Sequence, residues 1–155
     1  MIKILFICHG NICRSPMAEY MFRHMVQEKG EGERFEIASA ATSAEELGNP
    51  VYPPAGRLLM QHGINCDTKR ARRIAKEDLS YYNVIIVMDR NNLANLRRSF
   101  SEADLSGVRL LMEYAGEYRD VADPWYTRDF ETTWKDLEIG LAALYEALVT
   151  GKDEI

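Results

Sequence analysis

Residues 1–16, MIKILFICHGNICRSP, combine an apolar run, a loop that contains a glycine and the start of a helix. The run from Ile2 to Ile7 is almost continuously apolar, which is typical of a strand buried on both faces of a sheet. After the loop, Ser15 at a cap position and Pro16 in the first turn predict a helix. We therefore expect a strand–loop–helix unit with Cys8 at the carboxyl end of its strand.

The rest of the chain continues this alternation. The expected strands cover residues 35–41, 83–88 and 108–112, and the expected helices cover 53–62 and 91–98. The last helix is marked by apolar residues at spacings of three and four: Trp134, Leu137, Leu141, Leu144 and Leu148. Thr133 with Asp136 resembles a capping box, which predicts that this helix starts there.

Alternating strands and helices predict an α/β fold, a four-stranded parallel sheet with helices on both faces. No repeat or linker divides the chain, so residues 1–155 are expected to form a single domain. In such folds ligands bind at the carboxyl ends of the strands, near the point where the strand order reverses. Cys8 lies at such an end.

Composition narrows the class of protein. The chain has 155 residues, 46% of them hydrophobic, and a net charge of −5, which argues against a general nucleic-acid binder. No apolar run is long enough for a membrane span or a secretory leader, so we expect a cytoplasmic protein, by default a monomer. Three cysteines are an odd number, which favours a catalytic or redox role over a disulfide framework.

Chemistry concentrates in the segment from Cys8 to Ser15, where five residues separate Cys8 from Arg14. A loop that leads into a helix N-terminus directs backbone N–H groups at one point, and such a nest binds a phosphate dianion. Arg14 can grip phosphate oxygens with two parallel hydrogen bonds. The same field stabilises a thiolate on Cys8, to which Ser15 can donate. Gly10 permits close approach of the backbone.

The same Cys–Arg spacing occurs a second time, from Cys66 to Arg72. That segment has no loop glycine, is followed by Arg73 instead of a hydroxyl residue, and does not follow a clear strand. We expect no phosphate site there.

The segment from Cys8 to Pro16 resembles the signature of the low-molecular-weight protein tyrosine phosphatases. The resemblance covers nearly the whole chain, through residues 39–42, 53–55, 63–64 and 87–93 and the Asp-Pro-aromatic triplet at 123–125. It implies the flavodoxin-like, phosphotyrosine phosphatase I-like variant of the expected fold. It also implies hydrolysis of phosphotyrosine in a protein, or of a small aryl phosphate, without a metal or other cofactor.

The resemblance further implies a role for each matching residue. Cys8 would be the nucleophile that forms a phosphocysteine, Arg14 the phosphate clamp and Ser15 the donor to the thiolate. Asn11 would hold the loop in shape. Asp123 would protonate the leaving oxygen and then activate water.

The other loop residues, His9, Gly10, Ile12 and Cys13, would complete the phosphate site, and the resemblance implies that Cys13 can form a reversible disulfide with Cys8. Trp125 and Tyr126 would form one wall of the pocket and select aryl over alkyl phosphates. The chain departs from the family at two places. Lys69 stands where the family often has a histidine that supports the loop, and Glu45-Glu46 stands where many members have an aromatic residue on the wall opposite the acid loop.

Three other functions are compatible with parts of this pattern. A thioredoxin-linked arsenate reductase shares the signature but needs a downstream cysteine pair, and only Cys66 lies outside the loop. A protein-arginine phosphatase of the same family would carry threonine in place of Ile12. A phosphate-binding or thiol-switch module would use Cys8 and Cys13 but would not need Asp123.

The acidic wall predicts a charge preference among substrates. Because Glu45 and Glu46 repel negative charge, phosphotyrosine peptides with basic flanks should have a higher kcat/KM than peptides with acidic flanks. Steady-state kinetics on a matched pair of peptides tests this, and faster turnover of the acidic peptide would place the two glutamates away from the mouth of the pocket.

Overall fold

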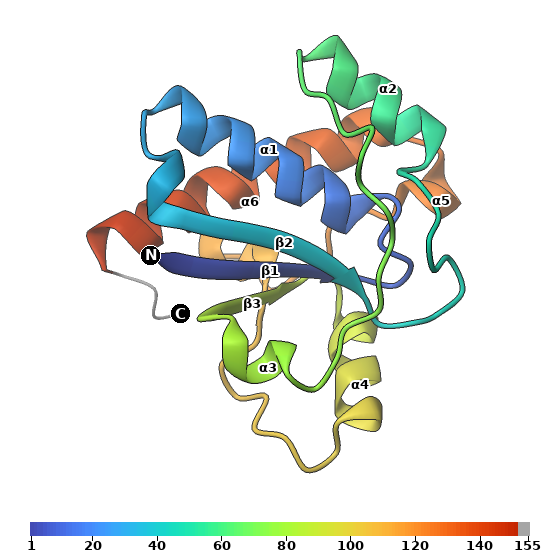
Figure 1. Ribbon diagram of the computed structural model, residues 1–155, viewed down its shortest axis with the longest axis vertical. Helices are drawn as coiled ribbons and strands as arrows, with labels where there is room; N and C mark the ends of the chain where they lie inside the picture. The colour runs from blue at the N-terminus through green and yellow to red at the C-terminus, as the bar shows by residue number, and fades with distance from the viewer. Residues whose placement is uncertain (152–155) are drawn as a thin grey trace.

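The computed structural model describes residues 1–151 (Figure 1). Its centre is a parallel sheet of four strands in the order β2-β1-β3-β4. The strands are β1 (Ile2–Cys8), β2 (Phe35–Ala41), β3 (Val84–Val87) and β4 (Arg109–Leu110). The predicted sheet is therefore confirmed, although β4 is shorter than expected because the chain turns into a 3₁₀ helix, η2 (Leu111–Ala115).

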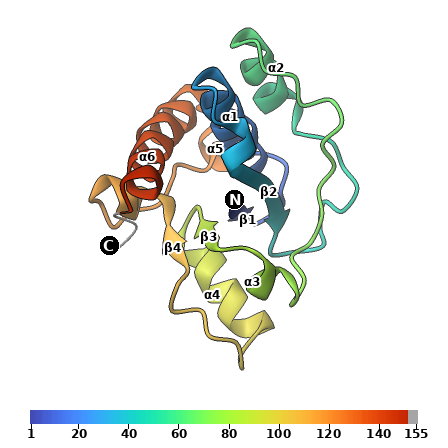
Figure 2. The same ribbon diagram turned by 60° about the vertical axis from the view of Figure 1, so that its left-hand side comes forward.

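Helices cover both faces of the sheet, as predicted (Figure 2). One face carries α1 (Arg14–Glu28), α2 (Pro53–Gln61) and α6 (Phe130–Thr150). The other face carries α3 (Asp78–Tyr81) and α4 (Arg90–Ser99). Two shorter helices, the 3₁₀ helix η1 (Gly32–Arg34) and α5 (Pro124–Thr127), complete the described chain. None of the helices among residues 1–151 is long and apolar enough to cross a membrane.

The strand β1 contributes to a separate apolar core on each face. Ile4 and Phe6 pack with α1 and α6, whereas Leu5 and Ile7 pack with Leu96 of α4. All four β1 side chains are fully buried. Alternate residues of a strand point to opposite faces, so a strand covered on both sides must be apolar throughout, as this one is.

The end of β1 lies where the direction in which successive strands are added to the sheet reverses. From β1 the chain moves outward to β2 and then returns across β1 to β3. Loops that follow β1 and β3 therefore diverge to opposite faces, which leaves a crevice at their carboxyl ends. Cys8 is the last residue of β1 and lies at this crevice.

Two predicted helix starts are wrong. The helix α1 begins at Arg14 after Cys13, which makes no side-chain cap, and the Ser15 hydroxyl contacts Cys8 instead. The helix α6 begins at Phe130, where the side chain of Asp129 accepts a hydrogen bond from Thr132 N at 3.0 Å. The expected capping pair, Thr133 and Asp136, lies inside α6 and is buried.

A close approach between α6 and η2 generates a stability prediction. A Cβ on Gly140 would lie 2.6 Å from Cγ and 2.9 Å from Cδ2 of the fully buried Leu111. Gly140→Ala should lower the free energy of unfolding by about 1–2 kcal/mol, since overpacking outweighs the helix-propensity gain of ~1 kcal/mol.

Gly56→Ala is the matched control. Gly56 lies in α2, and a Cβ on it would meet its nearest atom at 3.7 Å, an ordinary contact. Urea unfolding of both variants tests the prediction. We expect Gly56→Ala to be neutral or stabilising, and equal behaviour of the two variants would contradict the close packing of α6 on η2.

Candidate active site

The loop between β1 and α1 surrounds the sulfur of Cys8 with hydrogen-bond donors. The backbone N–H groups of Asn11 and Ser15 point at Sγ from 3.3 and 3.4 Å, and Ser15 Oγ lies 2.9 Å away. Cys8 is 4% exposed. A buried sulfur with three donors is arranged to carry negative charge, because each donor compensates for lost hydration.

Asn11 holds the loop in this shape. Its φ of 60° is in the left-handed region, which asparagine tolerates better than most residues. Its side-chain amide donates to Ser15 Oγ at 2.8 Å and to Ser39 Oγ at 2.9 Å, and its Oδ1 accepts from Arg72 N. Since Ser15 Oγ already accepts this bond, its own proton is directed to Cys8.

The loop is tied to a buried ion pair behind it. Ser39 of β2 donates to Glu19 Oε1 at 2.6 Å, and Lys69 Nζ lies 3.5 Å from the same oxygen. Lys69 Nζ also donates to the Ser39 carbonyl at 3.1 Å. Burial lowers the pKa of Lys69, although Glu19 opposes this shift. Lys69 thus supports the loop through Ser39 and Glu19.

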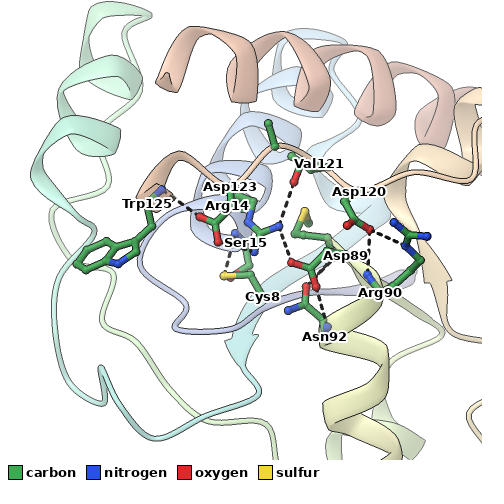
Figure 3. A network of polar contacts seen from close by, with 12 residues as sticks. Cys8, Arg14, Ser15, Asp89, Arg90, Asn92, Asp120, Val121, Asp123 and Trp125 are labelled. Atoms are coloured by element: carbon green, nitrogen blue, oxygen red, sulfur yellow. Dashed lines mark hydrogen bonds and ion pairs between the residues drawn. The ribbon is translucent and has the colours of Figure 1, made fainter. Parts of the chain in front are cut away.

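Arg14 lies between two carboxylates at the other side of the loop (Figure 3). Its guanidinium is 2.9 Å from Asp89 Oδ2 and 3.2 Å from Asp123 Oδ2, and it donates to the Val121 carbonyl at 3.1 Å. Burial lowers the pKa of Arg14, but the negative groups at Cys8, Asp123 and Asp89 raise it overall. The guanidinium is therefore a fixed positive charge beside the sulfur.

Asp123 begins α5 on the loop that leads into α6. Its Oδ1 accepts a hydrogen bond from Trp125 N at 3.0 Å. The preceding residue, Ala122, is held by α6: Thr133 Oγ1 donates to its carbonyl at 2.8 Å and Asp136 Oδ2 accepts from its N–H at 3.1 Å. The pair expected to cap α6 therefore anchors the segment that carries Asp123.

Cys13 is a buried thiol with negative groups nearby. Burial, followed by the nearby Cys8 and Asp123, raises the pKa of the Cys13 thiol to about 12. At neutral pH Cys13 is therefore a protonated thiol.

A pocket of about 580 Å³ opens above Cys8. Most of the other site residues predicted from the sequence line this pocket: His9, Gly10, Ile12, Cys13, Arg14, Glu45, Asp123, Trp125 and Tyr126. Asn11 and Ser15 do not line it and are buried behind it. His9 Nε2 contacts Glu45 at the rim. Trp125 and Tyr126 are 44% and 82% exposed, so they form an open wall. Among residues 1–151, no cluster of three or more His, Cys, Asp or Glu could hold a metal ion.

Sequence reasoning assigned no role to several residues that shape the site. Asp89, which contacts Arg14, is held by Asn92, whose N–H donates to Asp89 Oδ1 at 2.7 Å. Glu19 and Ser39 were likewise given no role. For Asp89 a signal was present, since it follows the third strand at the edge of the sheet where parallel folds place ligands.

The chain is similar to known proteins over nearly its whole length. The family model for low molecular weight phosphotyrosine protein phosphatases matches residues 3–153. The Bacillus subtilis low molecular weight protein-tyrosine-phosphatase YfkJ is 35% identical over 150 residues, 96% of each chain. Its crystal structure superposes with a TM-score of 0.93 and 34% identity, over 98% of this chain and 97% of that one.

A human relative, a low molecular weight phosphotyrosine protein phosphatase, is 37% identical over 140 residues, which are 86% of this chain and 87% of that one. The match to the family model spans the loop, the sheet and the segment that carries Asp123. The chain therefore belongs to the low molecular weight phosphotyrosine protein phosphatase family.

Proposed function

We propose that this chain hydrolyses phosphotyrosine in proteins, or small aryl phosphates, with Cys8 as the nucleophile. The observation that supports this most directly is the set of donors around the Cys8 sulfur, with the Arg14 guanidinium alongside. The loop can hold a phosphate whose phosphorus faces the sulfur. That is the arrangement that an in-line displacement requires.

The reaction proceeds in two displacements. The Cys8 thiolate attacks phosphorus, an S–P bond forms and the P–O bond to the aryl group breaks, while Asp123 gives its proton to the leaving oxygen. A water molecule then attacks the phosphocysteine and loses its proton to Asp123. The S–P bond breaks, which restores the thiolate and releases inorganic phosphate.

Arg14 and the loop stabilise the charge on the transferring phosphoryl group. Asp123 Oδ2 is 3.2 Å from Arg14 in the structure. A phosphate in the loop competes for the same guanidinium, which releases the carboxyl group toward the leaving oxygen. Asp89 keeps its contact with Arg14 and so maintains the orientation of the guanidinium.

The walls of the pocket support a preference for aryl phosphates. Ile12 lies at the loop and Trp125 beside Asp123, so a flat ring can pack between apolar surfaces while its phosphate reaches Cys8. Tyr52 supports the Trp125 ring at a centroid distance of 5.0 Å. An alkyl phosphate would leave these surfaces uncovered.

Three further properties belong to the same proposal. Peroxide oxidation of the Cys8 and Cys13 thiols, with loss of two electrons and two protons, would form a reversible disulfide and stop turnover. The cysteines among the described residues are all free thiols, which suits a cytoplasmic protein. A monomer is sufficient for activity, since one chain supplies the nucleophile, the clamp and the acid.

Replacement of Cys8 tests the function. Cys8→Ser should lower hydrolysis of p-nitrophenyl phosphate, with EDTA present, by more than about 10³-fold, because a serine hydroxyl is a far weaker nucleophile. Cys66→Ser is the control, since Cys66 lies outside the pocket, against α2, and should keep wild-type turnover.

The outcomes separate the competing functions. Turnover that survives in Cys8→Ser would rule out Cys8 as the nucleophile. Phosphate binding without turnover by the reduced wild type would favour a binding or thiol-switch module. Faster hydrolysis of phosphoarginine than of phosphotyrosine would indicate a protein-arginine phosphatase, and arsenate reduction linked to thioredoxin would indicate a reductase.

Replacement of Asp123 tests the acid. Asp123→Asn should lower kcat by about 10²–10⁴-fold on phosphotyrosine. The loss should be smaller on p-nitrophenyl phosphate, because nitrophenolate leaves more readily without a proton. Asp120→Asn is the control, as Asp120 contacts Arg90 outside the pocket. Equal losses on both substrates would show that Asp123 does not protonate the leaving group.

A further inference from the structure

The pocket extends beyond the phosphate loop along α4. Besides the loop and the acid segment, it is lined by Asn91, Ala94, Asn95 and Arg98. Its volume of about 580 Å³ lies within the range for drug-sized ligands, so space remains beyond a phenyl phosphate. This extension is where residues next to a phosphotyrosine would lie.

The α4 side of this pocket is polar and ends in a positive charge. Asn91, Asn95 and Arg98 follow one another at spacings of four and three, so they share one face of the helix. Arg98 lies about 10 Å further along the axis than Asn91. Its guanidinium donates to Asn95 Oδ1, and within residues 1–151 it forms no ion pair with a carboxylate.

The opposite side carries two carboxylates, Glu45, which contacts His9 Nε2, and Glu46. Glu45 and Glu46 follow β2, and Glu46 packs so close to the loop that a Cβ on Gly10 would lie 3.2 Å from Glu46 Cγ. Because β1 lies between β2 and β3, the segment after β2 and the helix after β3 flank the phosphate loop on opposite sides. Figure 1 shows that α4 and the segment after β2 both follow the carboxyl ends of their strands, at the same end of the sheet.

We propose that this pocket selects substrates by the order of the charged residues on the two sides of a phosphotyrosine. Its preferred substrate is a phosphopeptide with acidic residues on one flank, which contact Arg98, and basic residues on the other flank, which contact Glu45 and Glu46. The inference rests on the proposed phosphotyrosine hydrolysis. Opposite charges on the two sides favour one direction of the peptide and penalise the reverse, in which both flanks meet like charge.

Two peptides of identical composition test this. One carries three glutamates before the phosphotyrosine and three lysines after it, and the other has the two flanks exchanged. Wild type should hydrolyse one of them with a kcat/KM at least about fivefold higher than the other, and the ratio should shrink in high salt. Because net charge is the same, only the order of charges can produce the difference.

Arg98→Glu should bring this ratio close to one or invert it. Arg97→Glu is the matched control: it makes the same charge change on the neighbouring exposed residue, which lines a separate hollow beside Phe100. It should keep the wild-type ratio. A ratio near one in the wild type, or a ratio unchanged by Arg98→Glu, would overturn the inference.

Free phosphotyrosine separates the inference from the function on which it rests. Turnover of free phosphotyrosine together with equal rates on the two peptides would overturn only the inference about the order of charges. Absence of turnover on free phosphotyrosine and both peptides would overturn the proposed function as well.

Discussion

Hydrogen bonds from backbone N–H groups to the Cys8 sulfur depend on the left-handed conformation of Asn11. Such a conformation costs free energy in a residue other than glycine, and it persists only where the surroundings enforce it. Here the enforcement comes from the Asn11 side chain, which bonds to Ser15, to Ser39 of β2 and to the backbone of Arg72. The shape of the loop around Cys8 is thus secured by strands and segments far away in sequence.

Charge balance around Arg14 is the second requirement. An arginine that is 3% exposed would be costly alone, and two carboxylates compensate for it. The two differ in their surroundings: Asp89 caps α4, is held by Asn92 and is 13% exposed, whereas Asp123 caps a helix of four residues and is 28% exposed. Asp89 is therefore the more enclosed partner of the guanidinium, and Asp123 is the more accessible one.

The departure at Lys69 changes how the loop is supported without removing the support. Lysine is a flexible point charge with three donors, so it can reach both the Ser39 carbonyl and Glu19. Burial lowers the pKa of Lys69, and the carboxylate of Glu19 opposes that shift. Behind the loop, the support in this chain is therefore a buried ion pair.

The sequence alone determined the sheet, the buried β1 strand and the phosphate loop, because these depend on apolar periodicity and on residues that are neighbours along the chain. It also indicated Asp123, through the resemblance. It misplaced the first residues of α1 and α6. Ser15, Thr133 and Asp136 have residue types typical of caps but make tertiary hydrogen bonds instead. Only the tertiary structure brought Asp89 to Arg14, Lys69 to Glu19 and Arg98 to the pocket, because contacts between side chains on different elements are set by the packing of those elements and leave no local pattern in the sequence.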